Sequence, residues 1–295
     1  MLPTDQRTDF DSLVPALPCD RRSFIVTALG AGFALAVQPV MAQTAISTDS
    51  YGLVAGEIKV PTADGEMPAY RAQPAVGSNF ATILVVQEIF GVHEYIKDTC
   101  RRLAKLGYQA IAPEIYARQG DPRQFENIQD LLAKVVSKVP DAQVMSDLDA
   151  CAAWAKGNGG DAGRLGITGF CWGGRIVWLY AAHNPQVKAG VAWYGRIVGQ
   201  PSELMPKNPI DVAGQLHGPV LGLYGKEDQG IPQDTLEQMK KALAAADNAA
   251  SKASQIHVYD NAGHAFHADY RPSYRPAAAE DGWQRMRTWL QQNGL

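Results

Sequence analysis

The sequence predicts an α/β fold with a mostly parallel, doubly wound sheet that begins with an antiparallel hairpin. Short, continuous apolar runs alternate with segments of helical periodicity along most of the chain. Buried strands separated by amphipathic helices are typical of a parallel sheet that is covered on both faces. The 295 residues are 46% hydrophobic and 19% charged, which suits a folded domain with a sizeable core.

The predicted elements follow one another in a regular order. Residues 57–60 and 67–70 flank a turn at Asp64-Gly65 and form the opening hairpin. Strands are expected over residues 81–87, 109–112, 165–170, 189–194, 220–224 and 255–259. Helices are expected over residues 95–106, 122–139, 142–156, 173–182, 233–246 and 276–292.

Residues 1–42 are predicted to be an export signal rather than part of the fold. Arg21 and Arg22 precede an uncharged stretch at 24–37, and this arrangement resembles a bacterial twin-arginine signal. The stretch is shorter than the roughly 20 apolar residues of a membrane-spanning helix. We therefore expect recognition by the twin-arginine export machinery, cleavage after Ala42, and a periplasmic or secreted protein with no stable membrane anchor. Residues 43–52 would then be a linker, and residues 53–295 the folded domain.

Composition excludes several classes of function. The 27 Lys and Arg balance 30 Asp and Glu, for a net charge of −3, so nucleic-acid binding has little support. Four cysteines are too few for a disulfide scaffold, and none has metal-ligand spacing. We expect no metal and no cofactor. Cys100 and Cys151 lie on apolar helical stripes and are expected to fill the core.

Cys171 has a different setting. A predicted strand runs directly into a predicted helix through Gly169-Phe-Cys171-Trp-Gly173, a nucleophile elbow with Cys in place of Ser. The tight turn requires very small residues two positions before and after the nucleophile, and both are glycine. A thiol at a helix N-terminus is favoured as a thiolate. Cys171 is therefore the candidate nucleophile.

Its partners are expected after later strands, in the order acid and then histidine. The loop after strand 220–224 offers Asp228, with Glu227 the less favoured choice, and the loop after strand 255–259 offers His264. The remaining histidines fit surface or capping positions better: His93, His183, His217, His257 and His267. Cys171, Asp228 and His264 are the predicted catalytic set.

With these motifs, residues 53–292 resemble the dienelactone hydrolase family of the α/β-hydrolase fold. Further matching motifs are Gln-Glu-Ile-Phe-Gly at 87–91, Pro-Glu-Ile-Tyr-Ala-Arg at 113–118 and Trp-Tyr-Gly at 193–195. The resemblance implies that Glu88 meets the resting thiol and that the amides of Ile89 and Trp172 form the oxyanion hole. It also implies that Arg118 binds a substrate carboxylate and that Tyr194 lines the substrate site.

Two features of individual residues bear on these implications. Glu88 ends an apolar run, so its carboxylate is expected to be partly desolvated even without the resemblance. Dienelactone-specific members carry a second arginine four residues after the catalytic histidine, where this chain has Ala268. Arg196, Arg271 or Arg275 are the candidates to compensate for it.

The sequence thus predicts a carboxymethylenebutenolidase-like hydrolase of small carboxylic esters or lactones. It would act through a Cys-His-Asp triad and an acyl-enzyme intermediate, with a small molecule as its partner. The alternative is a non-catalytic exported module that keeps the fold for binding or for sensing through its thiol. The joint presence of Cys171, Asp228, His264 and Glu88 favours the hydrolase, because a binding module does not need all four.

Overall fold

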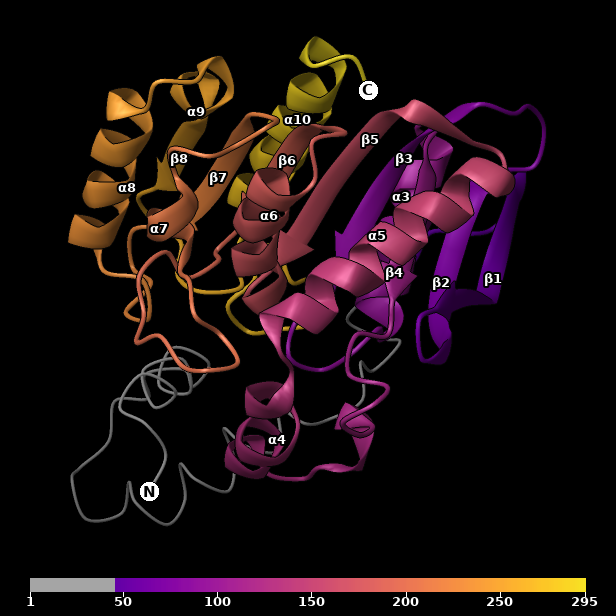
Figure 1. Cartoon of the computed structure of the whole chain (residues 1–295), viewed down its shortest axis with the longest axis horizontal. Helices are drawn as coiled ribbons and strands as arrows, with labels where there is room; N and C mark the ends of the chain where they lie inside the picture. Colours follow the sequence, from indigo (N-terminus) through magenta and orange to yellow (C-terminus); the bar gives the residue numbers. More distant parts are fainter. Residues whose placement is uncertain (1–45) are drawn as a thin grey trace.

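The computed structural model describes residues 46–295, so the predicted signal sequence and its cleavage site lie outside the described residues. Eight strands form one sheet in the order β1-β2-β4-β3-β5-β6-β7-β8 (Figure 1). The strands are β1 (Leu53–Thr62), β2 (Gly65–Pro74), β3 (Phe80–Val86), β4 (Gln109–Pro113), β5 (Gly160–Phe170), β6 (Val187–Trp193), β7 (Val220–Gly225) and β8 (Gln255–Tyr259). The predicted α/β class is confirmed.

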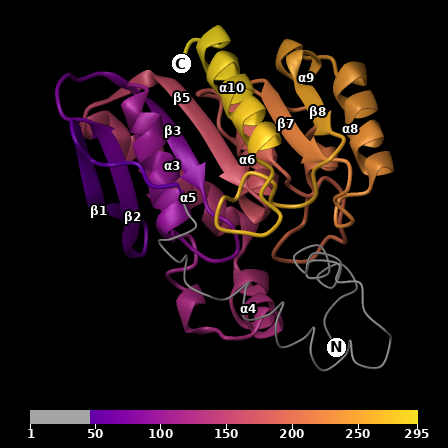
Figure 2. The same cartoon turned by 180° about the vertical axis from the view of Figure 1, so that it is seen from behind.

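The helices cover both faces of this sheet. They are α3 (Glu94–Lys105), α4 (Ile128–Lys134), α5 (Asp141–Gly157), α6 (Trp172–His183), α7 (Pro209–Val212), α8 (Gln233–Ala245), α9 (Ala249–Ala253) and α10 (Pro276–Gln292). Helices α5 and α6 lie in front of the sheet in Figure 1, and α3 and α10 cover the opposite face in Figure 2. The short helix α4 lies apart from both layers, beyond the carboxyl ends of the central strands (Figure 1).

The hairpin forms the antiparallel edge that the sequence predicts. Strands β1 and β2 pair from Leu53 opposite Pro74 to Thr62 opposite Gly65, and β2 then pairs antiparallel with β4. All other neighbouring strands run parallel. Because the inner strands are parallel, their carboxyl ends meet at one edge of the sheet, and loops from separate strands gather there.

The helix predicted over residues 122–139 is broken into three short pieces, which corrects that expectation. A 3₁₀ turn spans Pro122–Gln124, and the backbone is extended at Phe125 and again at Asn127. The Asn127 side chain accepts a hydrogen bond from the Gln129 N–H (2.7 Å), so α4 starts only after this cap. A second 3₁₀ turn at Val136–Lys138 follows. The breaks allow this segment to turn over the sheet edge.

The core lies between the sheet and its helices and is built from the apolar runs that the sequence predicted. Ile83, Leu84 and Ile167 on the central strands are fully buried. Cys100 and Cys151 are also fully buried in the core, as expected, and burial raises the pKa of both thiols. These two cysteines therefore contribute to packing.

The residues just before β1 pack against helix α3. The carbonyl oxygen of Thr48 accepts a hydrogen bond from Arg101 Nε at 2.7 Å.

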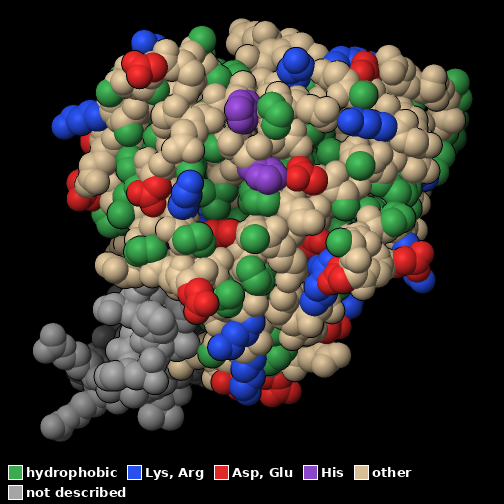
Figure 3. Space-filling view, in the orientation of Figure 1, with side chains coloured by type: hydrophobic (Ala, Val, Ile, Leu, Met, Phe, Trp, Pro, Cys, Tyr) green, Lys and Arg blue, Asp and Glu red, His purple; other side chains and the backbone are tan. Residues whose placement is uncertain are grey.

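Among residues 46–295, no helix is long and apolar enough to cross a membrane. On the face shown in Figure 3, basic and acidic side chains are interspersed with apolar ones.

Candidate active site

Cys171 occupies the sharp turn between β5 and α6. Its backbone has φ 55° and ψ −117°, a conformation that side-chain-bearing residues rarely adopt. A Cβ atom at Gly169 would lie 2.4 Å from the Gly173 carbonyl oxygen, and one at Gly173 would lie 2.4 Å from the Val86 carbonyl oxygen. Only glycine fits at either position. The local sequence therefore forces the strained turn that presents the thiol at the start of α6.

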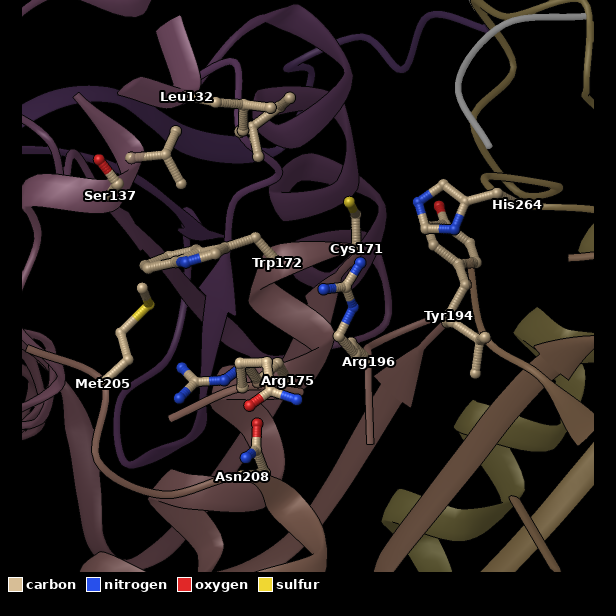
Figure 4. Close-up of a pocket in the computed structure, with 14 residues that line it drawn as sticks. Leu132, Ser137, Cys171, Trp172, Arg175, Tyr194, Arg196, Met205, Asn208 and His264 are labelled. Carbon is tan, nitrogen blue, oxygen red and sulfur yellow. The ribbon is translucent and has the colours of Figure 1, made fainter. Parts of the chain in front are cut away.

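The structure brings the three predicted catalytic residues to one site. His264 Nδ1 lies 2.7 Å from Asp228 Oδ2, and the other Asp228 oxygen accepts the Gly230 N–H at 2.9 Å. Cys171 and His264 line the same cavity, and Figure 4 shows the two side chains next to each other. A carboxylate only accepts hydrogen bonds, so the Nδ1 proton belongs to His264 and Nε2 is left to accept a proton from a neighbour.

The electrostatics of this pair favour a protonated imidazole. Burial acts to lower the pKa of His264, but the negative charges of Asp228 and of an ionised Cys171 outweigh it. The pKa of His264 is therefore raised well above its usual value. An imidazole stabilised as its cation beside the sulfur can take the thiol proton and hold it.

The predicted oxyanion-hole residues and Tyr194 also line this cavity. Trp172 is the first residue of α6, where a backbone N–H has no acceptor within the helix. Ile89 follows β3, on the neighbouring loop. The Tyr194 ring packs edge-on against the His264 imidazole, with centroids 5.2 Å apart, and so limits rotation of this candidate base.

Glu88 is buried as expected, but its partners differ from those implied by the resemblance. Tyr270 donates a hydrogen bond to Glu88 Oε2, and His93 Nε2 lies 3.4 Å from the same oxygen. Burial alone would raise the pKa of Glu88; His93, Arg271 and Tyr270 outweigh it and lower the pKa to about 2. We call Glu88, His93, Tyr270 and Arg271 the Glu88 cluster; among the described residues, the hydrogen bond to the carboxylate comes from Tyr270 and none comes from Cys171.

The Glu88 cluster joins two loops that border the candidate site. Glu88 and His93 lie between β3 and α3, on the loop that carries Ile89, whereas Tyr270 and Arg271 follow His264 on the loop before α10. The Arg271 guanidinium lies 4.9 Å from the centre of the Phe90 ring, which strengthens the contact between the loops. The cluster therefore fixes the Ile89 amide relative to His264.

The position of Arg118 corrects the expectation that it faces the substrate. Its guanidinium forms ion pairs with Asp64 (2.6 Å) and with Asp147 (2.8 Å), and it does not line the cavity beside Cys171. The hydrogen bond from Arg118 lowers the pKa of Asp64. Asp64 is in the hairpin turn and Asp147 is on α5, so Arg118 ties the hairpin to the helix layer.

The three arginines considered as substitutes at Ala268 lie in different places. Arg196 lines the cavity, and Arg271 is buried in the Glu88 cluster. Arg275 is exposed and donates to backbone carbonyls of its own loop. Only Arg196 among these three therefore borders the space beside Cys171 in the structure.

Sequence reasoning missed several residues of the site. Tyr270 carried no local signal, because its partner Glu88 is far away in the sequence. His93 was expected at a surface or cap; it is indeed the N-cap of α3, but it also contacts Glu88. His267 is buried, and its Nδ1 lies 2.5 Å from the Tyr95 hydroxyl.

Within residues 46–295, no group of three or more His, Cys, Asp or Glu side chains is placed to hold a metal ion.

Comparison with known proteins gives consistent matches. The family model described as "Dienelactone hydrolase family" matches residues 67–294. A protein of Methylorubrum extorquens named "Putative carboxymethylenebutenolidase" is 65% identical over 288 residues, covering 97% of this chain and 98% of its own length. An Escherichia coli K12 protein of the same name is 55% identical over 271 residues, covering 92% of this chain and 98% of its own.

A solved structure also matches over most of the chain. The crystal structure of a "Putative Dienelactone Hydrolase" from Klebsiella pneumoniae superposes with a TM-score of 0.79 at 58% sequence identity. The match covers 81% of this chain and 99% of that chain. The architecture described above is therefore shared with this structure.

Proposed function

We propose a specific reaction for this chain, which belongs to the dienelactone hydrolase family and is a hydrolase. It cleaves small carboxylic esters or lactones through a thioester on Cys171. The observation that carries this proposal is the shared cavity of Cys171 and His264, with Asp228 hydrogen-bonded to the far side of the imidazole at 2.7 Å. A positioned nucleophile, base and orienting carboxylate are the parts that acyl transfer needs.

In the first half of the reaction, His264 Nε2 takes the proton from the Cys171 thiol as the sulfur attacks the ester carbonyl carbon. The resulting oxyanion accepts hydrogen bonds from the Ile89 and Trp172 amides. Collapse of the tetrahedral intermediate breaks the bond between the carbonyl carbon and the alcohol oxygen. The imidazolium returns its proton to that oxygen, so an alcohol leaves and the acyl group stays on the sulfur as a thioester.

In the second half, water takes the place of the thiol. His264 removes a proton from the water as its oxygen attacks the thioester carbonyl, and the same two amides hold the oxyanion. The carbon–sulfur bond then breaks, the sulfur regains a proton, and a carboxylic acid is released. Asp228 remains an anion throughout and keeps the imidazole in the tautomer that both steps use.

The rigid surroundings of the triad support this proposal. The Glu88 cluster holds the loop that carries the Ile89 amide, and Tyr194 packs against the imidazole. Donors that are already positioned need no reorganisation when charge develops on the substrate oxygen. The role of Glu88 in this proposal is therefore to position the oxyanion hole.

The test is hydrolysis of 4-nitrophenyl acetate by the purified protein. We expect Cys171→Ala to lower kcat by a factor on the order of 10⁵ to 10⁶. Mass spectrometry of the quenched enzyme should place the acyl adduct on Cys171. The matched control is Cys100→Ala, which removes a thiol buried in the core and should retain turnover.

Two results would contradict the proposal. One is an acyl adduct on Cys100 or Cys151 together with undiminished activity of Cys171→Ala. The other is stoichiometric binding of ester analogues without turnover of any ester, which would favour the non-catalytic binding or thiol-sensing module.

A further inference from the structure

The cavity beside Cys171 has a volume of about 100 Å³, and much of its wall is apolar. Leu132 and Val136 come from the broken segment around α4, and Met205 comes from the loop between β6 and α7. Trp172 completes this surface, which we call the apolar wall: Leu132, Val136, Trp172 and Met205. Two excursions of the chain over the sheet edge therefore add apolar side chains that the triad itself does not require.

The apolar wall itself carries no charged side chain, and the two arginines of the cavity lining, Arg175 and Arg196, belong to other parts of it. No Asp or Glu is among the described residues that line the cavity. The lining residue Arg175 makes two hydrogen bonds to Asp141, of 2.7 and 2.8 Å, and its charge is thereby balanced. The Trp172 ring is held edge-on against Tyr116, with centroids 5.1 Å apart, so this part of the wall is a fixed surface.

The apolar wall and the catalytic base lie on opposite sides of the nucleophile. In Figure 4, Leu132, Trp172 and Met205 lie to one side of Cys171, and His264 and Tyr194 lie to the other. The leaving alcohol oxygen must receive its proton from His264, so the alcohol group lies on the histidine side. The acyl substituent of the same carbonyl then points toward the apolar wall.

We propose that the apolar wall is an acyl-binding subsite, which makes the protein selective for esters of apolar acids larger than acetic acid. This inference rests on the ester hydrolysis proposed above. Burying one methylene stabilises a complex enough to change kcat/KM by about fourfold. Two added methylenes should therefore raise kcat/KM for a butanoate over an acetate by roughly fifteenfold.

The experiment compares 4-nitrophenyl acetate, butanoate and hexanoate as an acyl series with methyl, propyl and butyl acetates as an alcohol series. We expect kcat/KM to rise along the acyl series and to change much less along the alcohol series. Val136→Phe should fill the subsite and reduce the butanoate-to-acetate ratio at least fivefold. Met205→Glu, at a half-exposed position that tolerates a polar side chain, should reduce the same ratio by placing a charge on the wall.

Val76→Glu is the matched control, because Val76 is 88% exposed and does not line the cavity. This control should leave the ratio unchanged. The subsite is refuted if acetate is the best acyl substrate, if the alcohol series responds instead, or if both wall variants keep the wild-type ratio. Failure of the catalytic proposal would look different, since no ester of either series would then be hydrolysed.

Discussion

Replacing Tyr270 with Phe removes a single hydroxyl from the Glu88 cluster. The ring can stay in place, because it packs against His93 and Tyr95 with centroids 5.1 and 5.4 Å away. Glu88, which is only 1% exposed, loses the donor to its Oε2 atom. The perturbation therefore isolates one hydrogen bond to a buried charge.

The magnitude follows from the pKa of Glu88. A decrease from 4.5 to about 2 corresponds to about 3 kcal/mol of preference for the ionised carboxylate in the folded protein. A hydrogen bond to a charged group is typically worth about 1.5–3 kcal/mol. Tyr270→Phe should thus lower the free energy of unfolding by about 2 kcal/mol at neutral pH, or the melting temperature by roughly 4–8 °C.

The pH dependence has a definite sign. Because the folded-state pKa of Glu88 is depressed, its contribution to stability is fully present above the unfolded pKa of about 4.5 and is lost as the pH falls toward 2. Tyr270→Phe should raise the folded-state pKa. The difference in stability between the two proteins should therefore shrink as the pH is lowered from 5 to 2.

Urea unfolding followed by tryptophan fluorescence measures these changes. Tyr51→Phe removes a hydroxyl from a side chain that is 89% exposed, and it should change the unfolding free energy by less than about 0.5 kcal/mol. If Tyr270→Phe is equally silent at pH 7, or if its effect grows in acid, the cluster does not stabilise the protein as argued.

Three further predictions concern other parts of the chain. Asp228→Asn should lower kcat by a factor on the order of 10⁴, as in other triads, because His264 loses the acceptor that fixes its tautomer; unchanged ester hydrolysis would exclude this role. Arg118→Ala should lower the urea midpoint, because the Arg118 guanidinium pairs with two carboxylates that it holds together. The substitution should change kcat/KM equally for an anionic ester and its neutral isostere. A selective loss with the anionic ester would contradict this prediction. Replacing Arg21 and Arg22 together with Lys should abolish export, and N-terminal sequencing of exported protein should begin near residue 43; export that the double variant does not impair would refute the twin-arginine signal.

Local sequence patterns determined the fold class and the elbow. The run of apolar residues before Gly169 defines a buried strand, and the two glycines around Cys171 permit only a tight turn into a helix. Strand ends in a parallel sheet meet at one edge, so the order of the strands along the chain was enough to place the loops carrying Asp228 and His264 near Cys171. These inferences succeed because they depend on short-range geometry and on sheet topology.

The tertiary structure alone decided which charged side chains meet. The sequence could not show that Glu88 contacts Tyr270, because the two residues lie on loops that only the folded domain brings together. Arg118 follows β4, and carboxylates from the hairpin and from α5 pair with its guanidinium there. Local periodicity fixes the elements, but the partners of long polar side chains depend on which surfaces pack against one another.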